Sequence, residues 1–197
     1  MCNILSDRYM GLLYFVWGCL MFSCDEPTSP TDIDEAKAAF EYLNKVRQDP
    51  DAYSDELGVD LSALAATHAL IWNDTLAIVA HEKALDMATR EYFDHVDPEG
   101  NGMNIKIHEA GYLLDSLFIT DRANNFFESL AAGNSSGIEA IQTLIIDEGL
   151  EPPGHRNHLL GITPFYSDCY DVGIGFVKSA SAPFSSYCCV LIAKKGF

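Results

Sequence analysis

Apolar side chains recur every three or four residues in several separate stretches of the chain. The first stretch, residues 32–47, carries Ile33, Ala36, Phe40, Leu43 and Val46 at this spacing. Because a helix turns once in about 3.6 residues, these side chains share one helical face. Thr31 or Asp32 can cap the start of this helix, and Asp49-Pro50 ends it. The same spacing predicts further helices at residues 74–92, 121–132 and 137–147, with short helical turns at 105–110 and 155–160.

Two segments near the C-terminus follow the pattern of strands instead. In residues 171–178, bulky apolar residues alternate with Gly173 and Gly175, which is the period of a strand. The apolar run within residues 187–194 is continuous enough to be buried on both faces of a sheet. Residues 179–186 join the two segments as a hairpin loop. Helices followed by a few antiparallel strands predict one α+β domain.

An uninterrupted apolar run of thirteen residues, 10–22, lies near the N-terminus behind Arg8. As a helix this run would be about 20 Å long, which is shorter than the ~30 Å hydrocarbon core of a bilayer. Such a length is typical of the apolar region of a signal peptide. The polar, proline-containing segment 25–31 then forms a tether, and the folded domain is expected at residues 32–197.

Cys24 follows the apolar run directly after the small residue Ser23. A cysteine in this place resembles the modification site of bacterial lipoproteins, where it becomes the acylated N-terminus of the mature chain. We therefore predict a lipoprotein-type signal peptide over residues 1–24 and a membrane anchor on Cys24. Cys19 is a competing site, and an ordinary cleaved signal peptide or an uncleaved anchor is the alternative.

The charge of the chain excludes one large class of partner. The sequence has 12 Lys and Arg against 29 Asp and Glu, a formal net charge of −17. A surface this acidic repels phosphate backbones, so we expect no nucleic-acid partner. Anionic lipid headgroups are disfavoured for the same reason. A cation, a neutral or apolar ligand, or a protein partner remains.

Cysteine usage is typical of an exported protein. Three cysteines lie in the targeting region, and the other three, Cys169, Cys188 and Cys189, lie within the last thirty residues. An oxidising compartment favours one disulfide among these last three. Because adjacent strand residues point to opposite faces, only one of Cys188 and Cys189 can easily face Cys169. We predict a Cys169–Cys189 disulfide.

Three polar residues stand in places that suit chemistry. His95 lies in a glycine- and proline-containing loop after a long predicted helix, where a side chain can project into a cleft. His155 opens a short helix, whose positive end favours the neutral imidazole that binds a metal or accepts a proton. Glu128 lies in an otherwise apolar stretch, where an unpaired carboxylate would be costly. Each of the three is therefore a candidate ligand or catalytic group.

Four short motifs follow one another in order along the chain. They are Phe93-Asp94-His95-x-Asp-Pro-x-Gly, Glu128-Ser129-Leu130-Ala131-Ala132-Gly133, Gly154-His155-Arg156-x-x-Leu-Leu and Val172-Gly173-Ile174-Gly175. Together they resemble the CAP superfamily of cysteine-rich secretory proteins, antigen 5 and pathogenesis-related 1 proteins, whose domain is also called the SCP domain. The resemblance spans residues 32–194 and is greatest to the bacterial branch.

This resemblance implies an α-β-α sandwich with a central antiparallel sheet and a cleft lined by two histidines and two acidic residues. His95, Glu128 and His155 match three of those positions, and Glu148, or Asp147 beside it, is the candidate for the fourth. Two neutral imidazoles with one or two carboxylates suit Zn²⁺ with an open position for water. The sequence departs from the family pattern in three places. Ser129 and His158 stand where the family usually has asparagine, and an acidic turn replaces the tryptophan common before the Gly-His-Arg motif.

Two rival metal sites compete with this cleft. His155 and His158 are three residues apart and so share a helix face. The loop Asp97–Gly102 places oxygen ligands at the first, third and fifth positions, with glycine at the sixth, as a calcium-binding EF-hand loop does. Its twelfth position is His108 instead of glutamate, so the family resemblance explains the loop better.

Three functions fit these observations. The first is an exported, lipid-anchored domain that binds a divalent cation in its cleft and an extracellular ligand, either a lipid or a protein. The second is a hydrolase of the peptidase type, with His95 or His155 as general base or with metal-activated water. The third is a structural or adhesion domain in which the polar cluster stiffens the core. We favour the first.

Overall fold

A computed structural model describes residues 31–196 of the chain. The expected signal peptide, the lipidation site Cys24 and all of the tether except Thr31 lie outside the described residues. The principal helices are α1 (Asp32–Gln48), α3 (Asp74–Arg90), α4 (Met103–Glu109), α5 (Gly137–Ile146) and α6 (Gly154–Leu160), and the shorter ones are α2 (Ser54–Leu57), α7 (Pro164–Ser167) and the 3₁₀ turns Asp51–Tyr53 and Ser116–Ile119. The strands are β1 (Ile71–Trp72), β2 (Glu128–Ala132), β3 (Asp171–Lys178) and β4 (Ser186–Ala193).

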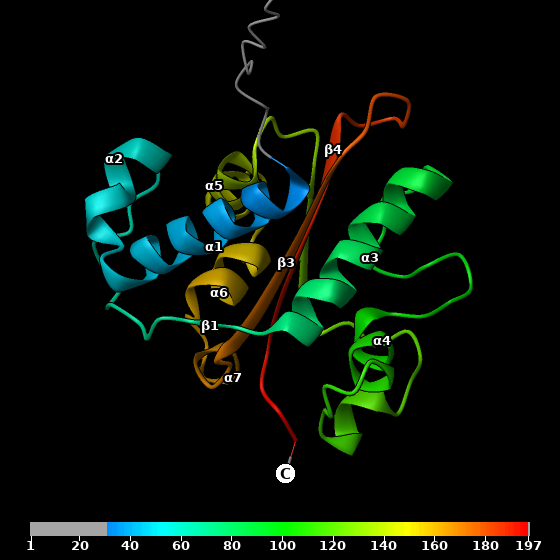
Figure 1. Cartoon of the computed structure of the whole chain (residues 1–197). Coiled ribbons are helices and arrows are strands. Elements are labelled where there is room, and N and C mark those ends of the chain that lie inside the picture. Colours follow the sequence, from blue (N-terminus) through cyan, green and yellow to red (C-terminus); the bar gives the residue numbers. More distant parts are fainter. Residues whose placement is uncertain (1–30, 197) are drawn as a thin grey trace, which may run out of the picture.

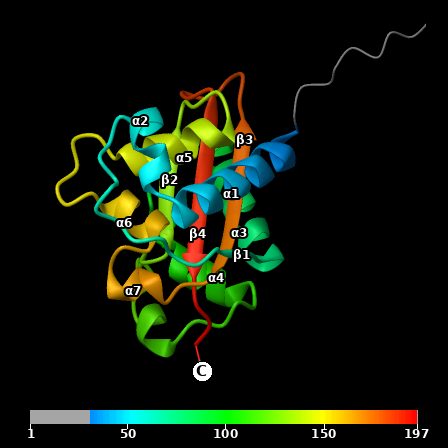
Figure 2. The same ribbon diagram turned by 90° about the vertical axis from the view of Figure 1, so that its left-hand side faces the viewer.

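The sheet lies between two layers of helices. Helices α3 and α4 cover one face, and helices α1, α5 and α6 cover the other (Figures 1 and 2). The strand order is β1-β3-β4-β2. The pairs β3–β4 and β4–β2 are antiparallel, whereas the two-residue β1 pairs with β3 in parallel. The expected α-β-α sandwich is thus confirmed, with a sheet that is antiparallel except at its β1 edge.

Local capping explains where the long helices begin. Thr31 and Asp34 form a reciprocal capping box at α1, Asn73 accepts from the backbone of α3, and Ser136 accepts from the backbone of α5. Such side chains bond the backbone N–H groups that a first helical turn leaves free. The helices expected at 32–47, 74–92 and 137–147 are confirmed within one or two residues at each end.

The alternating glycines of β3 let helix α3 pack directly onto the strand. A Cβ at Gly173 would lie 2.1 Å from the Leu76 backbone, and one at Gly175 would lie 2.3 Å from the Ala80 backbone. Any larger residue would push the helix away from the sheet. The core on both sides is closely packed, and every residue of β4 is buried.

The helix expected at residues 121–132 is wrong. The chain there runs through turns and then forms strand β2, in which Glu128 pairs with Leu191 and Ala132 with Tyr187 of β4. The short apolar run that suggested a helix is buried because it belongs to a strand of a covered sheet. Periodicity alone does not distinguish these two structures in a short run.

The expected Cys169–Cys189 disulfide is not formed, and Cys169, Cys188 and Cys189 are buried free thiols. Cys189 pairs with Gly175 in the middle of β3, whereas Cys169 precedes the start of that strand at Asp171. The strand alone therefore separates them by about 13 Å, and a disulfide needs Cα atoms within about 7 Å. Burial raises the pKa of Cys169 to about 11 and that of Cys188 to about 12, so both stay protonated.

None of the helices within residues 31–196 combines the length and the apolar character that crossing a bilayer requires.

Candidate functional site: a histidine cleft

One cleft of about 490 Å³ brings together three of the four residues that the sequence singled out. His95, Glu128 and His155 come from the loop after α3, from strand β2 and from helix α6. Its other lining residues are Val96, Ala123, Asn124, Asn125, Ser129, Leu150, Pro152, Gly154, His158 and Tyr166. The convergence of residues this far apart in the sequence is the central geometric expectation of the family resemblance.

The imidazole of His95 is held by Glu128. The His95 Nδ1 lies 2.8 Å from Glu128 Oε2, and the Glu128 side chain is fully buried while that of His95 is 45% exposed. The Cys189 thiol donates to the other carboxylate oxygen, Oε1, at 3.5 Å. A buried carboxylate favours an N–H at Nδ1, which leaves the lone pair of the neutral ring on Nε2. Glu128 therefore selects the tautomer of His95.

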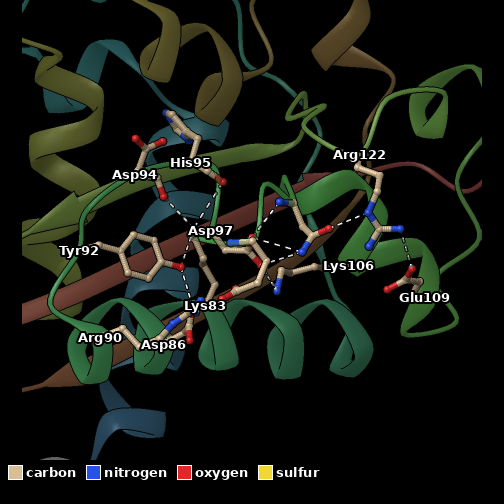
Figure 3. A network of polar contacts seen from close by, with 12 residues as sticks. Lys83, Asp86, Arg90, Tyr92, Asp94, His95, Asp97, Lys106, Glu109 and Arg122 are labelled. Atoms are coloured by element: carbon tan, nitrogen blue, oxygen red, sulfur yellow. Dashed lines mark hydrogen bonds and ion pairs between the residues drawn. The ribbon is translucent and has the colours of Figure 1, made fainter.

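The loop that carries His95 rests on a buried lysine of α3. Lys83 is only 3% exposed, and its ammonium donates to the backbone carbonyls of Asp94 at 2.7 Å and His95 at 3.4 Å. It also donates to the hydroxyl of Tyr92, which in turn donates to Asp86. Figure 3 shows this network beneath the loop. Lys83 thus fixes the backbone at His95 from the interior of the protein.

An ion pair and backbone hydrogen bonds at Asp97 stabilise the same loop two residues after His95. Asp97 pairs with Lys106 of α4 at 2.7 Å and accepts from the backbone of Asn101 at 2.8 Å (Figure 3). Burial alone would raise the pKa of Asp97, but Lys106 and Asn101 hold it well below its usual range. In the loop Asp97–Gly102, which has the spacing of the rival EF-hand reading, Lys106 thus pairs with the carboxylate that a calcium ion would need.

The second histidine of the cleft, His155, is oriented by a residue close to it in the sequence. His155 lies in the first turn of α6, and its Nδ1 is 2.7 Å from Asp147 Oδ1. Asp147 Oδ2 accepts from the backbone N–H groups of His155 at 2.8 Å and Arg156 at 3.3 Å. One buried carboxylate thus caps α6 and orients its histidine ring.

Of the two candidates for the fourth position, Asp147 and Glu148, only Asp147 contacts His155. Asp147 ends α5 in the left-handed conformation, with φ 52°. This reversal directs the Asp147 side chain toward α6 and leaves Glu148 exposed outside the cleft. Glu148, the predicted ligand, thus lies outside the cleft, and the carboxylate that contacts His155 is that of Asp147, the alternative beside it.

Sequence reasoning missed Asn125 as a residue of the cleft. Its Nδ2 lies 2.8 Å from His95 Nδ1, and its Oδ1 is buried without a partner within residues 31–196. A ring that donates from Nδ1 to Glu128 has no lone pair there for an amide hydrogen, so the reversed amide, with oxygen toward His95, gives the better hydrogen bonds. In either orientation, the second amide group stays buried without a hydrogen-bond partner within residues 31–196.

Ser129 and His158, which both stand where the family usually has asparagine, bond to each other. The Ser129 hydroxyl lies 2.7 Å from His158 Nδ1, and His158 Nε2 lies 3.4 Å from the carbonyl of Ile192. Burial lowers the pKa of His158 to about 3. Such a weak base cannot deprotonate a serine efficiently near neutral pH. Both ring nitrogens are engaged inside the protein, so His158 also cannot share a metal with His155.

The carboxylates of the cleft are not arranged as metal ligands. Within residues 31–196, His, Cys, Asp and Glu side chains nowhere form a group of three or more that could hold a metal ion. Each carboxylate instead contacts a histidine Nδ1, the arrangement in which outer groups orient metal-binding imidazoles. The residues present therefore fit a cation bound by two imidazoles with its other positions open to water, and they do not fit the expected set of four protein ligands.

The sandwich and its cleft define a domain in which one groove carries two histidines that buried carboxylates orient. A model of the CAP family, described as the cysteine-rich secretory protein family, matches residues 40–192. The chain belongs to this family. The resemblance found in the motifs around His95, Glu128 and His155 is thereby confirmed.

The chain is similar to three solved structures. An outer surface protein from Borrelia burgdorferi is 18% identical, with a TM-score of 0.53 over 85% of this chain and 97% of that one. An extracellular SCP-domain protein from Bacillus anthracis is 18% identical, with a TM-score of 0.48 over 85% and 45% of the two chains. Venom allergen-like protein 4 from Schistosoma mansoni is 15% identical, with a TM-score of 0.46 over 82% and 90%. A search among curated proteins found no match.

Proposed function

We propose that this chain is an exported CAP domain that binds an extracellular ligand through its histidine cleft, with a divalent cation such as Zn²⁺ held by His95 and His155. The observation that carries the proposal is that two imidazoles line one cleft with each Nδ1 turned to a buried carboxylate. This arrangement leaves two Nε2 lone pairs for a ligand. A bound cation would supply a Lewis-acidic position with open sites for water or a ligand oxygen.

Equilibrium dialysis with Zn²⁺ tests the cation. The wild type is compared with His95→Ala and His155→Ala, and His81→Ala serves as control because His81 is exposed on α3 outside the cleft. We expect one zinc per chain, affinity lowered about 100-fold or more in either cleft variant, and no change in the control. Equal uptake by all four proteins would contradict a cation in the cleft.

The same variants distinguish binding from catalysis. Turnover of a peptide library that disappears in His155→Ala would favour a hydrolase over a binding domain. We expect no such turnover, because the one serine that meets a histidine in the cleft faces the weak base His158.

We further propose that Cys24 carries a lipid anchor that holds the domain at the cell envelope. The apolar run 10–22, the small Ser23 and the polar segment after Cys24 support this anchor, and two of the similar structures are described as outer-surface or extracellular proteins. Metabolic labelling with a fatty-acid probe is expected to mark the wild type and not Cys24→Ala. Equal labelling of both proteins would contradict the anchor.

A further inference from the structure

Two exposed phenylalanines meet at one end of the sandwich. Phe184 lies in the loop between β3 and β4, Phe93 lies in the loop after α3, and their ring centres are 5.7 Å apart. Phe93 is 43% exposed and Phe184 is 40% exposed, although the Phe184 ring also packs edge-on against the buried Tyr187. We call Phe93 and Phe184 the aromatic pair. Exposed rings that cluster and are held in place, unlike scattered ones, indicate an interaction surface.

The loop that carries Phe184 is uncharged and held in a fixed shape. Residues 179–186 read Ser-Ala-Ser-Ala-Pro-Phe-Ser-Ser. The Ser179 N–H donates to the carbonyl of Ser185 at 2.9 Å, and the Ser179 hydroxyl accepts from the Ala182 N–H at 3.0 Å. In a chain with a net charge of −17, an exposed loop without charge suits a neutral surface better than a charged one.

The folded domain begins beside this loop. Lys178, at the base of the loop, donates from its backbone to Asp32 at 3.4 Å and from its ammonium to Glu35 at 2.8 Å. Asp32 and Glu35 belong to the first turn of α1, and Figures 1 and 2 show the start of α1 and the β3–β4 loop at the same end of the sandwich. Cys24 precedes Thr31 by seven residues, which span at most about 25 Å. A lipid anchor on Cys24 would therefore keep this end of the domain close to the membrane.

We propose that the aromatic pair docks on the membrane that holds this anchor, with Phe184 entering the headgroup region of zwitterionic lipids. This inference rests on the proposed lipidation of Cys24. Exposed aromatic side chains favour the boundary between headgroups and acyl chains. A short tether raises the effective concentration of the membrane surface, so a small apolar contact suffices for docking. The acidic first turn of α1 disfavours anionic headgroups at the same end.

A protein partner fits the aromatic pair less well. Two partly exposed rings offer far less area than a stable protein interface buries. They also lie at the end of the domain that the tether would hold against the membrane.

Docking through the aromatic pair leaves the histidine cleft accessible. Tyr187, which contacts both phenylalanines, pairs with Ala132 of β2. Glu128 lies four residues away from Ala132 along the same strand, about 13 Å further from the loop. The membrane-facing end and the cleft are therefore separate along the sheet.

Tryptophan fluorescence in vesicles tests the docking. The full chain with Phe184→Trp is acylated in cells and reconstituted into phosphatidylcholine vesicles whose acyl chains carry bromine near the headgroup, a contact quencher of tryptophan. Leu113→Trp is the matched control, because Leu113 is 58% exposed and its carbonyl bonds Gly196, which follows β4 at the opposite end of the sheet. After subtraction of the wild-type signal, we expect bromine to quench Phe184→Trp at least twofold more than Leu113→Trp. Equal quenching of the two variants would overturn the proposal.

A second pair of substitutions tests whether both rings take part. In the Phe184→Trp chain, Phe93→Ser is expected to lower the quenching about twofold or more, because it removes the neighbouring ring from the surface. Leu113→Ser in the same chain is expected to leave the quenching unchanged. Equal effects of Phe93→Ser and Leu113→Ser would overturn docking through the aromatic pair.

Fatty-acid labelling of the same chains separates a failure of the anchor from a failure of docking. A labelled chain in which Phe184→Trp is not quenched keeps the anchor and overturns the docking. An unlabelled chain overturns the anchor, and docking is then decided by coupling a maleimide lipid to Cys24 in a chain with Cys2→Ser and Cys19→Ser. The thiols of Cys169, Cys188 and Cys189 are buried and do not compete for this reagent. The same twofold difference in quenching is expected with this tether, and its absence would overturn the docking.

Discussion

The two histidines of the cleft are each oriented by a carboxylate at Nδ1, but the contacts that achieve this differ. Below, the local arm means His155 with Asp147, and the long-range arm means His95 with Glu128 and Lys83. His155 is oriented by Asp147, eight residues away, and the same carboxylate caps the helix that carries the histidine. His95 is oriented by Glu128, thirty-three residues away, and its loop is held by Lys83 from helix α3. The orientation of His155 therefore depends on a few contacts between neighbouring segments of the chain. The orientation of His95 depends instead on the assembly of the whole sandwich.

Because the long-range arm rests on Lys83, we expect Lys83→Met to cause the largest loss of stability. The substitution keeps the apolar stem but removes the donor shared by the Asp94 and His95 carbonyls and the Tyr92 hydroxyl. Leaving buried acceptors unpaired costs about 3 kcal/mol in total. Urea unfolding measures the change, with exposed Lys45→Met as a control that should shift by less than about 0.5 kcal/mol. Equal stability of the two variants would show that Lys83 does not hold the loop.

The buried His158 is expected to make the stability of the fold depend on pH. Its pKa is about 3 in the folded state, whereas an unfolded histidine has a pKa of about 6.5. The unfolded state therefore binds the extra proton below pH 6.5, and stability falls as pH decreases, by up to about 1.4 kcal/mol per pH unit. His158→Asn, which keeps a polar partner for Ser129, is expected to remove this slope between about pH 6 and 4. An unchanged slope in unfolding curves would contradict the burial of a neutral ring.

Asp147→Asn tests the local arm. Asparagine tolerates the left-handed backbone of this residue, so the chain path is preserved while the charge is lost. We expect about 1 kcal/mol lower stability from the weaker cap of α6 and zinc affinity reduced about 10–100-fold through His155. Glu148→Gln is the matched control and should change neither quantity. A stronger effect of Glu148→Gln would restore Glu148 as the acidic residue of the cleft.

Asp97→Asn is expected to have the smallest effect on stability. It tests the ion pair with Lys106 in the loop that carries His95. The pKa of Asp97 is held well below its usual range in the folded state, so its charge stabilises the fold above about pH 4 and this contribution is lost as pH falls further. The variant should be about 1 kcal/mol less stable at neutral pH, and the difference should shrink below about pH 4. A difference that stays constant as the solution is acidified would exclude the Lys106 ion pair as its cause.

The sequence predicted what depends on local pattern. The helices and the β3–β4 hairpin follow from periodicity and capping, and the motifs identified His95, Glu128 and His155. The strand at Glu128 was missed because its burial comes from β4, a partner about sixty residues away. Asp147 was not preferred over Glu148 because the left-handed turn that orients it is a property of the folded backbone.

Other parts of the site exist only after folding. Lys83 lies on the buried stripe of α3, and only the fold shows that its ammonium meets the carbonyls beneath His95. Asn125 belongs to no motif, and its role follows from its distance to His95. Two of the C-terminal thiols were expected to pair, but strand register, which composition does not reveal, keeps Cys169 and Cys189 apart.

The most direct test of the histidine cleft is a nitrogen-15 NMR spectrum of the histidine side chains during a zinc titration. We predict that Nε2 of both His95 and His155 shifts on binding while Nδ1 of each ring keeps its proton toward Glu128 or Asp147. Zinc that shifts neither ring, or only one of them, would contradict a shared site for the two imidazoles.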